Sequence, residues 1–356
     1  KPIEIWNQIL EDYSVAEVYT NHDYEPYARQ RDEQIENLLK KHKIRLKTYK
    51  DQVIFEKSEV VKGDGDPYIV YTPYKNKWKE HFSEEKNLTI YYTNDYLKNL
   101  LQNSRLPNLE LGEMGFKTAS LKVPDYTVTP TLIQDYEGTR NFPAITGGTS
   151  RLGPHLRFGT VSVRKMMKKA IAEKNETFWD ELIWREFFMQ ILWHYPETVN
   201  NAFKPKYDRI KWRNNEEEFE KWKNGETGFT LVDAGMRQLN TTGFMHNRVR
   251  MLTASFLCKH LLIDWRWGEA YFAEKLLDYE QSSNVGNWQW AAGSGVDAAP
   301  YFRIFNPMTQ VDKFDKDKKY IKEFVPEYDS DKYPEKMVDH KEARERCLRT
   351  YKEAVS

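Results

Sequence analysis

The sequence predicts an α/β plus all-α chain, in which a partial doubly wound α/β domain is followed by a large all-helical domain. Near the N-terminus, helix-like and strand-like segments alternate, which is typical of parallel sheets covered by helices. Beyond residue 150, apolar side chains recur at helical spacing and no further strand pattern follows. We expect residues 1–122 to hold the α/β part and the connection after it, and residues 123–356 to form the helical domain.

The α/β part consists of four expected elements. Residues 3–13 carry apolar side chains at helical spacing, and residues 15–20 have the pattern of a short strand. Residues 26–43, with Pro26 near their start, predict a second helix, and residues 44–49 a second strand. Strands joined through a helix lie parallel, and parallel sheets are buried on both faces. Two strands cannot form such a sheet alone, so we expect only the C-terminal part of a doubly wound domain here.

The pattern loosens between residues 51 and 150, where glycine and proline recur. This segment predicts a long connection with short helices, one of them near residues 74–82. A further helix is expected at residues 160–173. The last 45 residues are rich in both charge signs, which is typical of solvated helices and loops.

Composition excludes several classes of protein. Lys plus Arg and Asp plus Glu number 54 each, so any attraction to nucleic acid must come from a local patch. No apolar stretch reaches the roughly 18 residues of a membrane helix, and no signal-peptide pattern opens the chain. Two cysteines form neither a disulfide framework nor a zinc site, which favours a reducing, cytoplasmic location. The common hydrolase, nucleotide and metal motifs are absent, and no metal site is expected.

The aromatic content is high, with 11 Trp, 22 Tyr and 18 Phe. Large aromatic residues commonly fill a core, but they also provide stacking surfaces or a path for electrons. Composition alone leaves both interpretations open.

Residues 147–153, GGTSRLG, predict a phosphate-binding turn, since backbone N–H groups and hydroxyls ahead of a helix suit an anion. The alternative is a plain linker. In FWDELIWREFF, the side chains of Glu181, Trp184, Arg185 and Phe188 share one helix face. The alternative there is an intrahelical Glu181–Arg185 ion pair on a solvated face.

Two further segments combine polar and aromatic chemistry. Residues 236–267 hold five basic side chains against one acid, and Asn247 lies on one helix face with Met251. An amide can bind a base edge and an arginine such as Arg248 a phosphate, although a solvated helix end has the same pattern. Near residues 278–290, Trp288 and Trp290 should point about 200° apart on a helix, unless both simply fill the core.

Together these segments resemble the photolyase/cryptochrome flavoprotein family. The resemblance is carried by TSRLGPHLRFG, WDELIWREFF, TGFMHNRVRM and NWQWAAGSGVDAAPYFRIFNP, in that order. It covers about residues 15–350, is most specific over 136–311, and is greatest for class I cyclobutane pyrimidine dimer photolyases. YTNHDYEPYARQRD at 19–32 is similar to the later half of that family's antenna domain, whose first strands are absent.

The resemblance implies an α/β antenna domain followed by a helical domain that binds FAD. It implies a second antenna chromophore as well, with folate, deazaflavin or FMN left open. Gly153 stands where many members have Ser, and Glu280 where Asp is usual. Asn284 matches the residue beside flavin N5. The implied FAD contacts are Tyr136, Thr149, Ser150, Arg151, Leu152, Gly153, Phe178, Arg185, Arg250, Asp278, Tyr279, Glu280 and Asn284.

The resemblance also implies light-dependent DNA repair. Reduced FAD excited by blue or near-UV light would pass an electron to a flipped-out dimer, the ring would split, and the electron would return. Asn284 would support the reduced flavin. The implied dimer pocket is Glu181, Trp184, Asn247, Met251 and Trp290, with Arg185, Phe188 and Arg248 as further DNA contacts. Trp212, Trp265 and Trp288 match an electron-transfer chain.

The expected partner is UV-damaged DNA, single or double stranded. The protein is expected to bind it as a monomer and to have no membrane partner. A cryptochrome-type blue-light receptor is the alternative, which the pocket residues and Asn284 disfavour. A (6-4) photolyase would need a histidine where Met251 stands, and DASH-type members usually lack the tryptophan that Trp184 matches. A DNA-binding fragment without flavin is the fourth interpretation.

Overall fold

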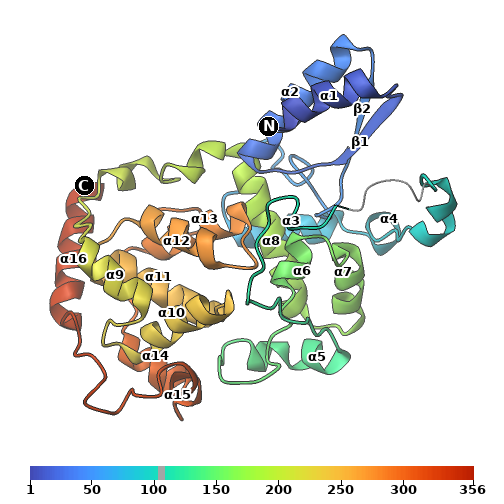
Figure 1. Cartoon of the computed structure of the whole chain (residues 1–356). Helices are drawn as coiled ribbons and strands as arrows, with labels where there is room; N and C mark the ends of the chain where they lie inside the picture. Colours follow the sequence, from blue (N-terminus) through green and yellow to red (C-terminus); the bar gives the residue numbers. More distant parts are fainter. Residues whose placement is uncertain (103–108) are drawn as a thin grey trace.

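The N-terminal part is a small α/β unit in the computed structural model, which describes residues 1–102 and 109–356. Helix α1 (Pro2–Asp12), strand β1 (Glu17–Asn21), helix α2 (Pro26–Lys41) and strand β2 (Arg45–Tyr49) follow in order. The strands pair in parallel, from Glu17 opposite Arg45 to Asn21 opposite Tyr49, so the parallel pairing is confirmed. Val18, Ile35 and Leu39 form their small core. Figure 1 shows this unit, in blue, projecting from the larger helical body.

The connection contains α3 (Tyr71–His81), α4 (Glu84–Asn87) and the 3₁₀ helix η1 (Thr93–Asn99). The helix expected near 74–82 is therefore confirmed, beginning three residues earlier as α3. Its side chains do not remain outside the helical domain. Tyr71, Tyr74 and Trp78 are buried in one core with residues from 128 to 191. Residues 54–88 thus pack as part of the helical body.

Helices dominate the remainder. Their bounds are α5 Pro130–Thr139, α6 Gly153–Arg157, α7 Val163–Ala172, α8 Glu176–His194, α9 Glu216–Asn224, α10 Thr230–Thr242, α11 Asn247–Ser255, α12 Trp265–Lys275, α13 Gln281–Ala292, α14 Pro307–Phe314, α15 Lys319–Phe324 and α16 His340–Val355. The 3₁₀ helices η2 (Pro196–Val199) and η3 (Pro205–Arg209) and the π-helical turn η4 (Phe256–His260) connect some of them. The helix expected at 160–173 is α7, and the short α6 separates it from the GGTSRLG turn.

Helix α8 is the axis of the helical body, since Figure 1 shows it between α5–α7 and α9–α13. It begins because the Asn175 side chain accepts hydrogen bonds from Thr177 N (2.9 Å) and Phe178 N (3.4 Å). A helix covered on several sides needs apolar residues around most of its circumference. Ten residues of α8, from Phe178 to Leu192, are buried.

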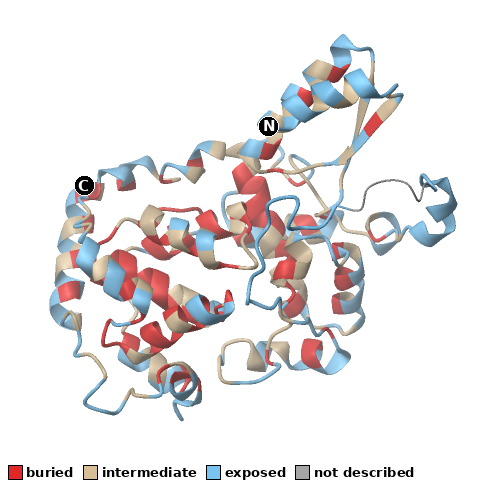
Figure 2. Cartoon of the chain, viewed as in Figure 1, coloured by how far each residue is buried: buried red, intermediate tan, exposed pale blue. Residues whose placement is uncertain are grey.

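The C-terminal segment is less solvated than its charge predicts. Tyr320, Ile321 and Val325 pack in the core of helices α9–α13. Cys347 and Tyr351 of α16 are fully buried in a separate cluster. Figure 2 shows this mixture of buried and exposed turns. The expectation of solvated helices and loops was wrong for these faces, because mixed charge on one side of a helix hides a narrow apolar stripe on the other.

Candidate active site: two cavities that share a wall

Helix α13 carries the wall between two cavities. Its first turn is capped by the Glu280 carboxylate, which accepts hydrogen bonds from the backbone of Ser282 and Ser283, both at 2.9 Å. This role accounts for an acidic residue before the helix, because a carboxylate satisfies the free N–H groups there. Asn284 and Trp288 lie four residues apart and share a face that lines the first cavity. Trp290 points toward the second cavity as well.

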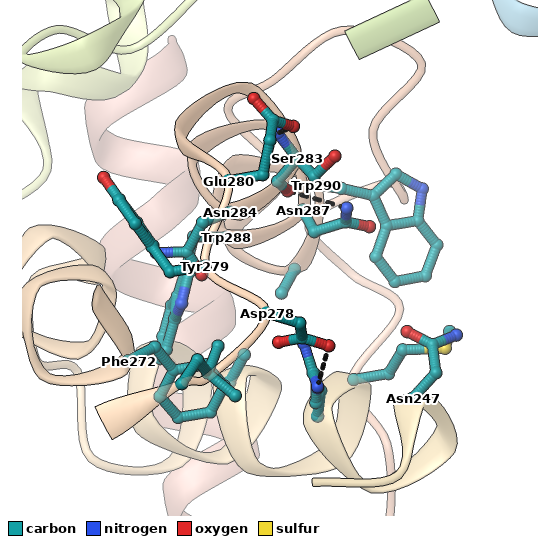
Figure 3. A pocket seen from close by; sticks show the side chains of 15 residues that line it. Asn247, Phe272, Asp278, Tyr279, Glu280, Ser283, Asn284, Asn287, Trp288 and Trp290 are labelled. Atoms are coloured by element: carbon teal, nitrogen blue, oxygen red, sulfur yellow. Dashed lines mark hydrogen bonds and ion pairs between the residues drawn. The ribbon is translucent and has the colours of Figure 1, made fainter. Parts of the chain in front are cut away.

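The first cavity has a volume of about 590 Å³. Figure 3 shows Asp278 near its centre, with Phe272 and Tyr279 on one side and Asn247 and Trp290 on the other. The lining comes almost entirely from α11, α12, α13 and the turn between α12 and α13: Asn247, Arg250, Met251, Ala254, Phe272, Leu276, Asp278, Tyr279, Glu280, Ser283, Asn284, Asn287, Trp288, Trp290 and Ala291. Six of the residues predicted to bind FAD or to support it electronically therefore meet here: Arg250, Asp278, Tyr279, Glu280, Asn284 and Trp288.

Hydrogen bonds hold Arg250 and Asn284 of the first cavity in place. Arg250 donates to Asp278 Oδ2 at 2.8 Å and to the Met245 carbonyl at 2.7 Å. The Asn284 amide donates to Glu269 Oε1 at 2.9 Å. Burial raises the pKa of Glu269, against the hydrogen bond from Asn284. Asp278 Oδ1 is buried without a hydrogen-bond partner, so it offers an acceptor to a ligand hydroxyl.

The GGTSRLG turn reaches the same region. A Cβ built on Gly153 would lie 2.7 Å from the Asp278 carboxylate, so only glycine fits there without a shift of Asp278. Arg151 adopts a left-handed backbone conformation, with φ of +53°. Its guanidinium and that of Arg250 each lie 5.6 Å from the centre of the Phe244 ring. The predicted phosphate-binding residues thus adjoin the first cavity at Gly153, whereas Thr149, Ser150, Arg151 and Leu152 do not line it.

Two other predicted FAD contacts lie behind that turn. Tyr136 and Phe178 pack edge to face, with ring centres 5.1 Å apart, and Phe178 is buried. Neither residue lines the first cavity. Tyr136 and Phe178 instead pack in the core that also holds Leu152 of that turn.

The residues present fit FAD. An arginine, three amides, hydroxyls and an unpartnered carboxylate oxygen surround an aromatic-lined space, and hydroxyl and backbone donors follow at the GGTSRLG turn. Such a mixture suits a flat ring system joined to a sugar and phosphates. Within residues 1–102 and 109–356, no three His, Cys, Asp or Glu side chains are grouped to hold a metal ion.

The second cavity has a volume of about 860 Å³ and lies across the wall. It is lined by Arg140, Glu181, Trp184, Arg185, Phe188, Asn247, Met251, Ser283, Asn287 and Trp290. The whole predicted dimer pocket, Glu181, Trp184, Asn247, Met251 and Trp290, is therefore brought together. Asn247, Met251, Ser283, Asn287 and Trp290 face both cavities.

Glu181 is paired across the second cavity rather than along its own helix. Its carboxylate binds the guanidinium of Arg140, the residue that follows α5. Burial raises the pKa of Glu181, and the charge of Arg140 opposes that shift. The alternative interpretation, an intrahelical Glu181–Arg185 ion pair, is wrong, because Arg185 instead donates to the Gln52 carbonyl. Arg185 lines the second cavity and not the first, where a flavin contact was predicted.

Arg248 lies outside both linings, although it was predicted to contact DNA beside the pocket. Its guanidinium binds the Asn141 side-chain oxygen and lies 4.5 Å from the centre of the Phe314 ring. Burial lowers the pKa of Arg248. Its Nε is buried without a partner, so it keeps a donor for an anion.

The three tryptophans of the predicted electron path share one core. Trp288 and Trp265 are buried, at 2% and 1% exposure, and Trp212 packs half-buried against the same cluster. Trp288 lines the first cavity and abuts α12 so closely that a Cβ on Gly268 would lie 2.1 Å from its ring. Of the three indoles only that of Trp212 is partly exposed, as the outer end of a path to the surface requires.

Sequence reasoning missed three groups of this site. Ser283 and Asn287 precede Trp290 by seven and three residues, so helical periodicity alone could have placed them on its face. Arg140 follows the end of α5 and meets Glu181 only in the fold, and Glu269 meets Asn284 in the same way. No local pattern connects those partners.

Comparisons with known proteins agree with this arrangement. Residues 178–331 match the FAD binding domain of DNA photolyase, and residues 1–89 match the DNA photolyase family. The deoxyribodipyrimidine photo-lyase of Alkalihalophilus pseudofirmus is 40% identical, over 93% of this chain and 73% of the relative. A solved bacterial class III photolyase from Agrobacterium tumefaciens superposes with a TM-score of 0.86 at 33% identity, over 99% of this chain and 82% of that one.

A solved archaeal photolyase from Sulfolobus tokodaii, which holds two FAD molecules, superposes with a TM-score of 0.77 at 31% identity, over 99% of this chain and 82% of that one. The predicted family and its FAD-binding domain are confirmed, whereas membership of class I stays a prediction. No helix within the described residues is long and apolar enough to cross a membrane. On these matches, the chain belongs to the DNA photolyase family.

Proposed function

We propose that the second cavity receives a cyclobutane pyrimidine dimer that has been flipped out of DNA. Membership of the family makes the chain a light-dependent DNA repair enzyme, so the open question is where its substrate binds. The observation that carries the proposal is the shared wall. Asn247, Met251, Ser283, Asn287 and Trp290 line both cavities, so molecules in the two cavities would lie next to each other against the same side chains.

The first cavity would hold the FAD. When bound and reduced, FAD supplies the excited electron that opens the dimer ring. Arg250 and Asp278 would orient it, since their ion pair fixes one donor and one free acceptor oxygen at the cavity centre. Asn284 would present its amide from a position fixed by Glu269. Trp288 excludes water from the inner side of the cavity, because it is buried between α12 and α13.

The second cavity would hold the dimer by stacking and by one carboxyl group. Trp184 and Trp290 are both on its lining, and flipped bases bind well between aromatic faces. The Glu181 carboxyl group is also on this lining, where it would hydrogen-bond a pyrimidine carbonyl or ring N–H as electron density rises there. Arg140 would hold that carboxyl group in place. Arg248 would contact the neighbouring phosphate, and Arg185 and Phe188 would complete the wall.

A dimer inside a duplex cannot reach this cavity, so extrusion is required. Dimers stack and pair badly, and their extrusion should therefore be less unfavourable than that of an undamaged pair. We propose that the protein binds single- or double-stranded damaged DNA as a class I-type monomer in the cytoplasm. The two buried free cysteines support a reducing location. The residues that line both cavities all follow residue 122, which supports a boundary of the catalytic part at 122/123, with residues 54–88 packed against that part. A folate, deazaflavin or FMN antenna chromophore belongs to the same proposal.

Repair of a thymine-dimer oligonucleotide tests the proposal. Purified protein is reduced with dithionite, mixed with the oligonucleotide, and divided between blue light and darkness. Restoration of intact thymines in the light only is the expected result. Absence of repair by protein that carries FAD would contradict it and favour a cryptochrome-type receptor or a different photoproduct. Absence of FAD would favour a DNA-binding fragment.

A further inference from the structure

Trp184 has one face covered by a residue from outside the helical domain's own sequence. The rings of Tyr71 and Trp184 are parallel within 7°, with centres 3.5 Å apart. Trp184 lines the second cavity and Tyr71 does not, so Tyr71 backs the indole on the side away from the cavity. Phe187 and Phe188 pack around the same indole, at 5.6 and 5.7 Å between ring centres.

Tyr71 is itself held at several points. It is 5% exposed, and its hydroxyl donates to the Asp180 carbonyl at 2.8 Å, one helical turn before Trp184. Its backbone N–H lies in the first turn of α3, where no intrahelical partner exists, and donates to Asp297 Oδ2 at 3.3 Å. Asp297 stands in a left-handed conformation, with φ of +44°. Such a position is uncommon for a residue with a side chain, and the aspartate is one of the residues that tolerate it.

Helix α3 is fastened to α8 along its length, which keeps Tyr71 from sliding. Lys75 binds the Asp180 carboxylate at 2.8 Å. Further along, the indole N–H of Trp78 donates to buried Glu186 at 2.6 Å. The Tyr71 ring at the start of α3 is therefore held in place by the contacts between α3 and α8.

We propose that Tyr71 is a positioning residue that fixes the plane of Trp184 for the flipped dimer. The inference rests on the proposed function of the second cavity. An indole with one open face can tilt toward that face, and a tilted indole stacks poorly on a base. A parallel ring behind it removes that freedom before the substrate arrives, which reduces the ordering that binding must supply. The hydrogen bond to the Asp180 carbonyl fixes the position of the Tyr71 ring along α8, and the stacking fixes the angle between the planes of the Tyr71 and Trp184 rings.

The test compares binding of two oligonucleotides in the dark, one with a thymine dimer and one undamaged. Tyr71→Leu removes the ring and Tyr71→Phe keeps it without the hydroxyl. Tyr71→Met, which fills the volume with a flexible chain, serves if the leucine variant does not fold. Tyr74→Leu is the matched control, because Tyr74 is also buried on α3 but packs on Phe187, with ring centres 5.4 Å apart.

Loss of an aromatic stacking contact should weaken dimer binding by about three- to tenfold. We expect this loss for Tyr71→Leu or Tyr71→Met, with unchanged binding of undamaged DNA and unchanged FAD content. Tyr71→Phe should keep most of the preference for the dimer-containing oligonucleotide. Tyr74→Leu should lower the melting temperature of the protein without altering that preference. Near-ultraviolet circular dichroism should lose the signal of the stacked Tyr–Trp pair in Tyr71→Leu and keep it in Tyr74→Leu.

Equal discrimination in wild type and Tyr71→Leu would overturn the positioning role while leaving the proposed function intact. Equal effects of Tyr71→Leu and Tyr74→Leu would overturn it as well, because general destabilisation would then explain both. If the wild type does not distinguish the two oligonucleotides, the proposed function itself fails, and this inference fails with it.

Discussion

The two cavities differ in how far along the chain their walls are collected. The first is lined only by residues 247–291, so consecutive helices and one turn build it. The second takes residues from 140, 181–188, 247–251 and 283–290. Its parts belong to two hydrophobic cores that meet at α8 and α13. Contacts between neighbouring segments can shape the first cavity, whereas the shape of the second depends on how the two hydrophobic cores pack against each other.

This difference has a functional counterpart. Changes in the first cavity should alter what the protein does with flavin, and changes in the second should alter what it does with DNA. Four substitutions test that separation, from the largest expected effect to the smallest.

Trp288→Phe should abolish photoreduction of the bound flavin while leaving repair by chemically reduced enzyme intact. The indole of Trp288 lines the first cavity and packs in the same core as Trp265. Phenylalanine is far harder to oxidise than tryptophan, so it would interrupt electron transfer to the flavin. Flavin absorbance during illumination with an external reductant measures the first property, and the dimer assay the second. Normal photoreduction in the variant would show that the electron path is misassigned.

Glu181→Gln should slow repair by about tenfold, the effect of losing one hydrogen bond between the carboxyl group and the reacting pyrimidine. FAD content should not change, because Glu181 lines only the second cavity. Repair per absorbed photon is the measurement. Glu176→Gln is the control, since Glu176 begins the same helix and pairs with Lys79 at the surface. Equal repair in Glu181→Gln and wild type would remove this residue from the mechanism.

Asp278→Asn should weaken FAD binding by about fivefold, because it removes the charge that pairs with Arg250 in the first cavity. Dimer binding by protein saturated with FAD should be unaffected. Titration of the apoprotein, followed by flavin fluorescence, measures the affinity. Asp208→Asn breaks a comparable pair with Arg266 away from both cavities and should leave FAD affinity unchanged. A loss of dimer discrimination in Asp278→Asn would show that the two cavities are not separable.

Acid should destabilise the fold through His246, which caps the helix that carries Asn247 and Met251 of the wall. Burial, with the charges of Arg250 and Arg248, lowers the pKa of His246 to about 4. The unfolded chain takes up this proton near pH 6.5, so between pH 6.5 and about 4 it binds more protons than the folded chain. The free energy of unfolding should therefore fall as the pH falls through this window, by about 1.4 kcal/mol per pH unit for this group.

The ring accepts a hydrogen bond from Arg248 N at 3.2 Å, which caps α11 below both cavities. His246→Asn keeps a capping group without the titration. Thermal melts from pH 7 to pH 4.5 should show a shallower loss of stability in His246→Asn, and no change in the exposed His42→Asn. A slope equal to that of the wild type would show that the folded chain protonates His246 as readily as the unfolded chain does.

The same comparison explains what could be predicted from sequence. The helices and strands near the N-terminus, and the shared face of α8, follow from local periodicity and were placed within a few residues. Arg185 was assigned to the flavin by resemblance, but its partner in the fold is Gln52, 133 residues away. Arg140 and Tyr71 were missed for the same reason. Arg140 meets Glu181, and Tyr71 meets Trp184, only where distant segments of the chain pack together. The resemblance therefore predicts the five dimer-pocket residues of the second cavity, whereas local pattern supplies none of their partners from distant segments.

Glu186 gives the packing of residues 54–88 on α8 a consequence for any attempt to divide the chain. Its buried carboxylate accepts hydrogen bonds from Ile54 N, from Phe55 N at 3.2 Å and from Trp78 Nε1 at 2.6 Å, all from before residue 122. Burial raises its pKa to about 7, against these hydrogen bonds. A fragment begun at residue 123 would leave this group with none of the three donors. Swapping antenna units between relatives should therefore keep residues 52–88 with the helical recipient, so that the exchanged module ends near Lys50.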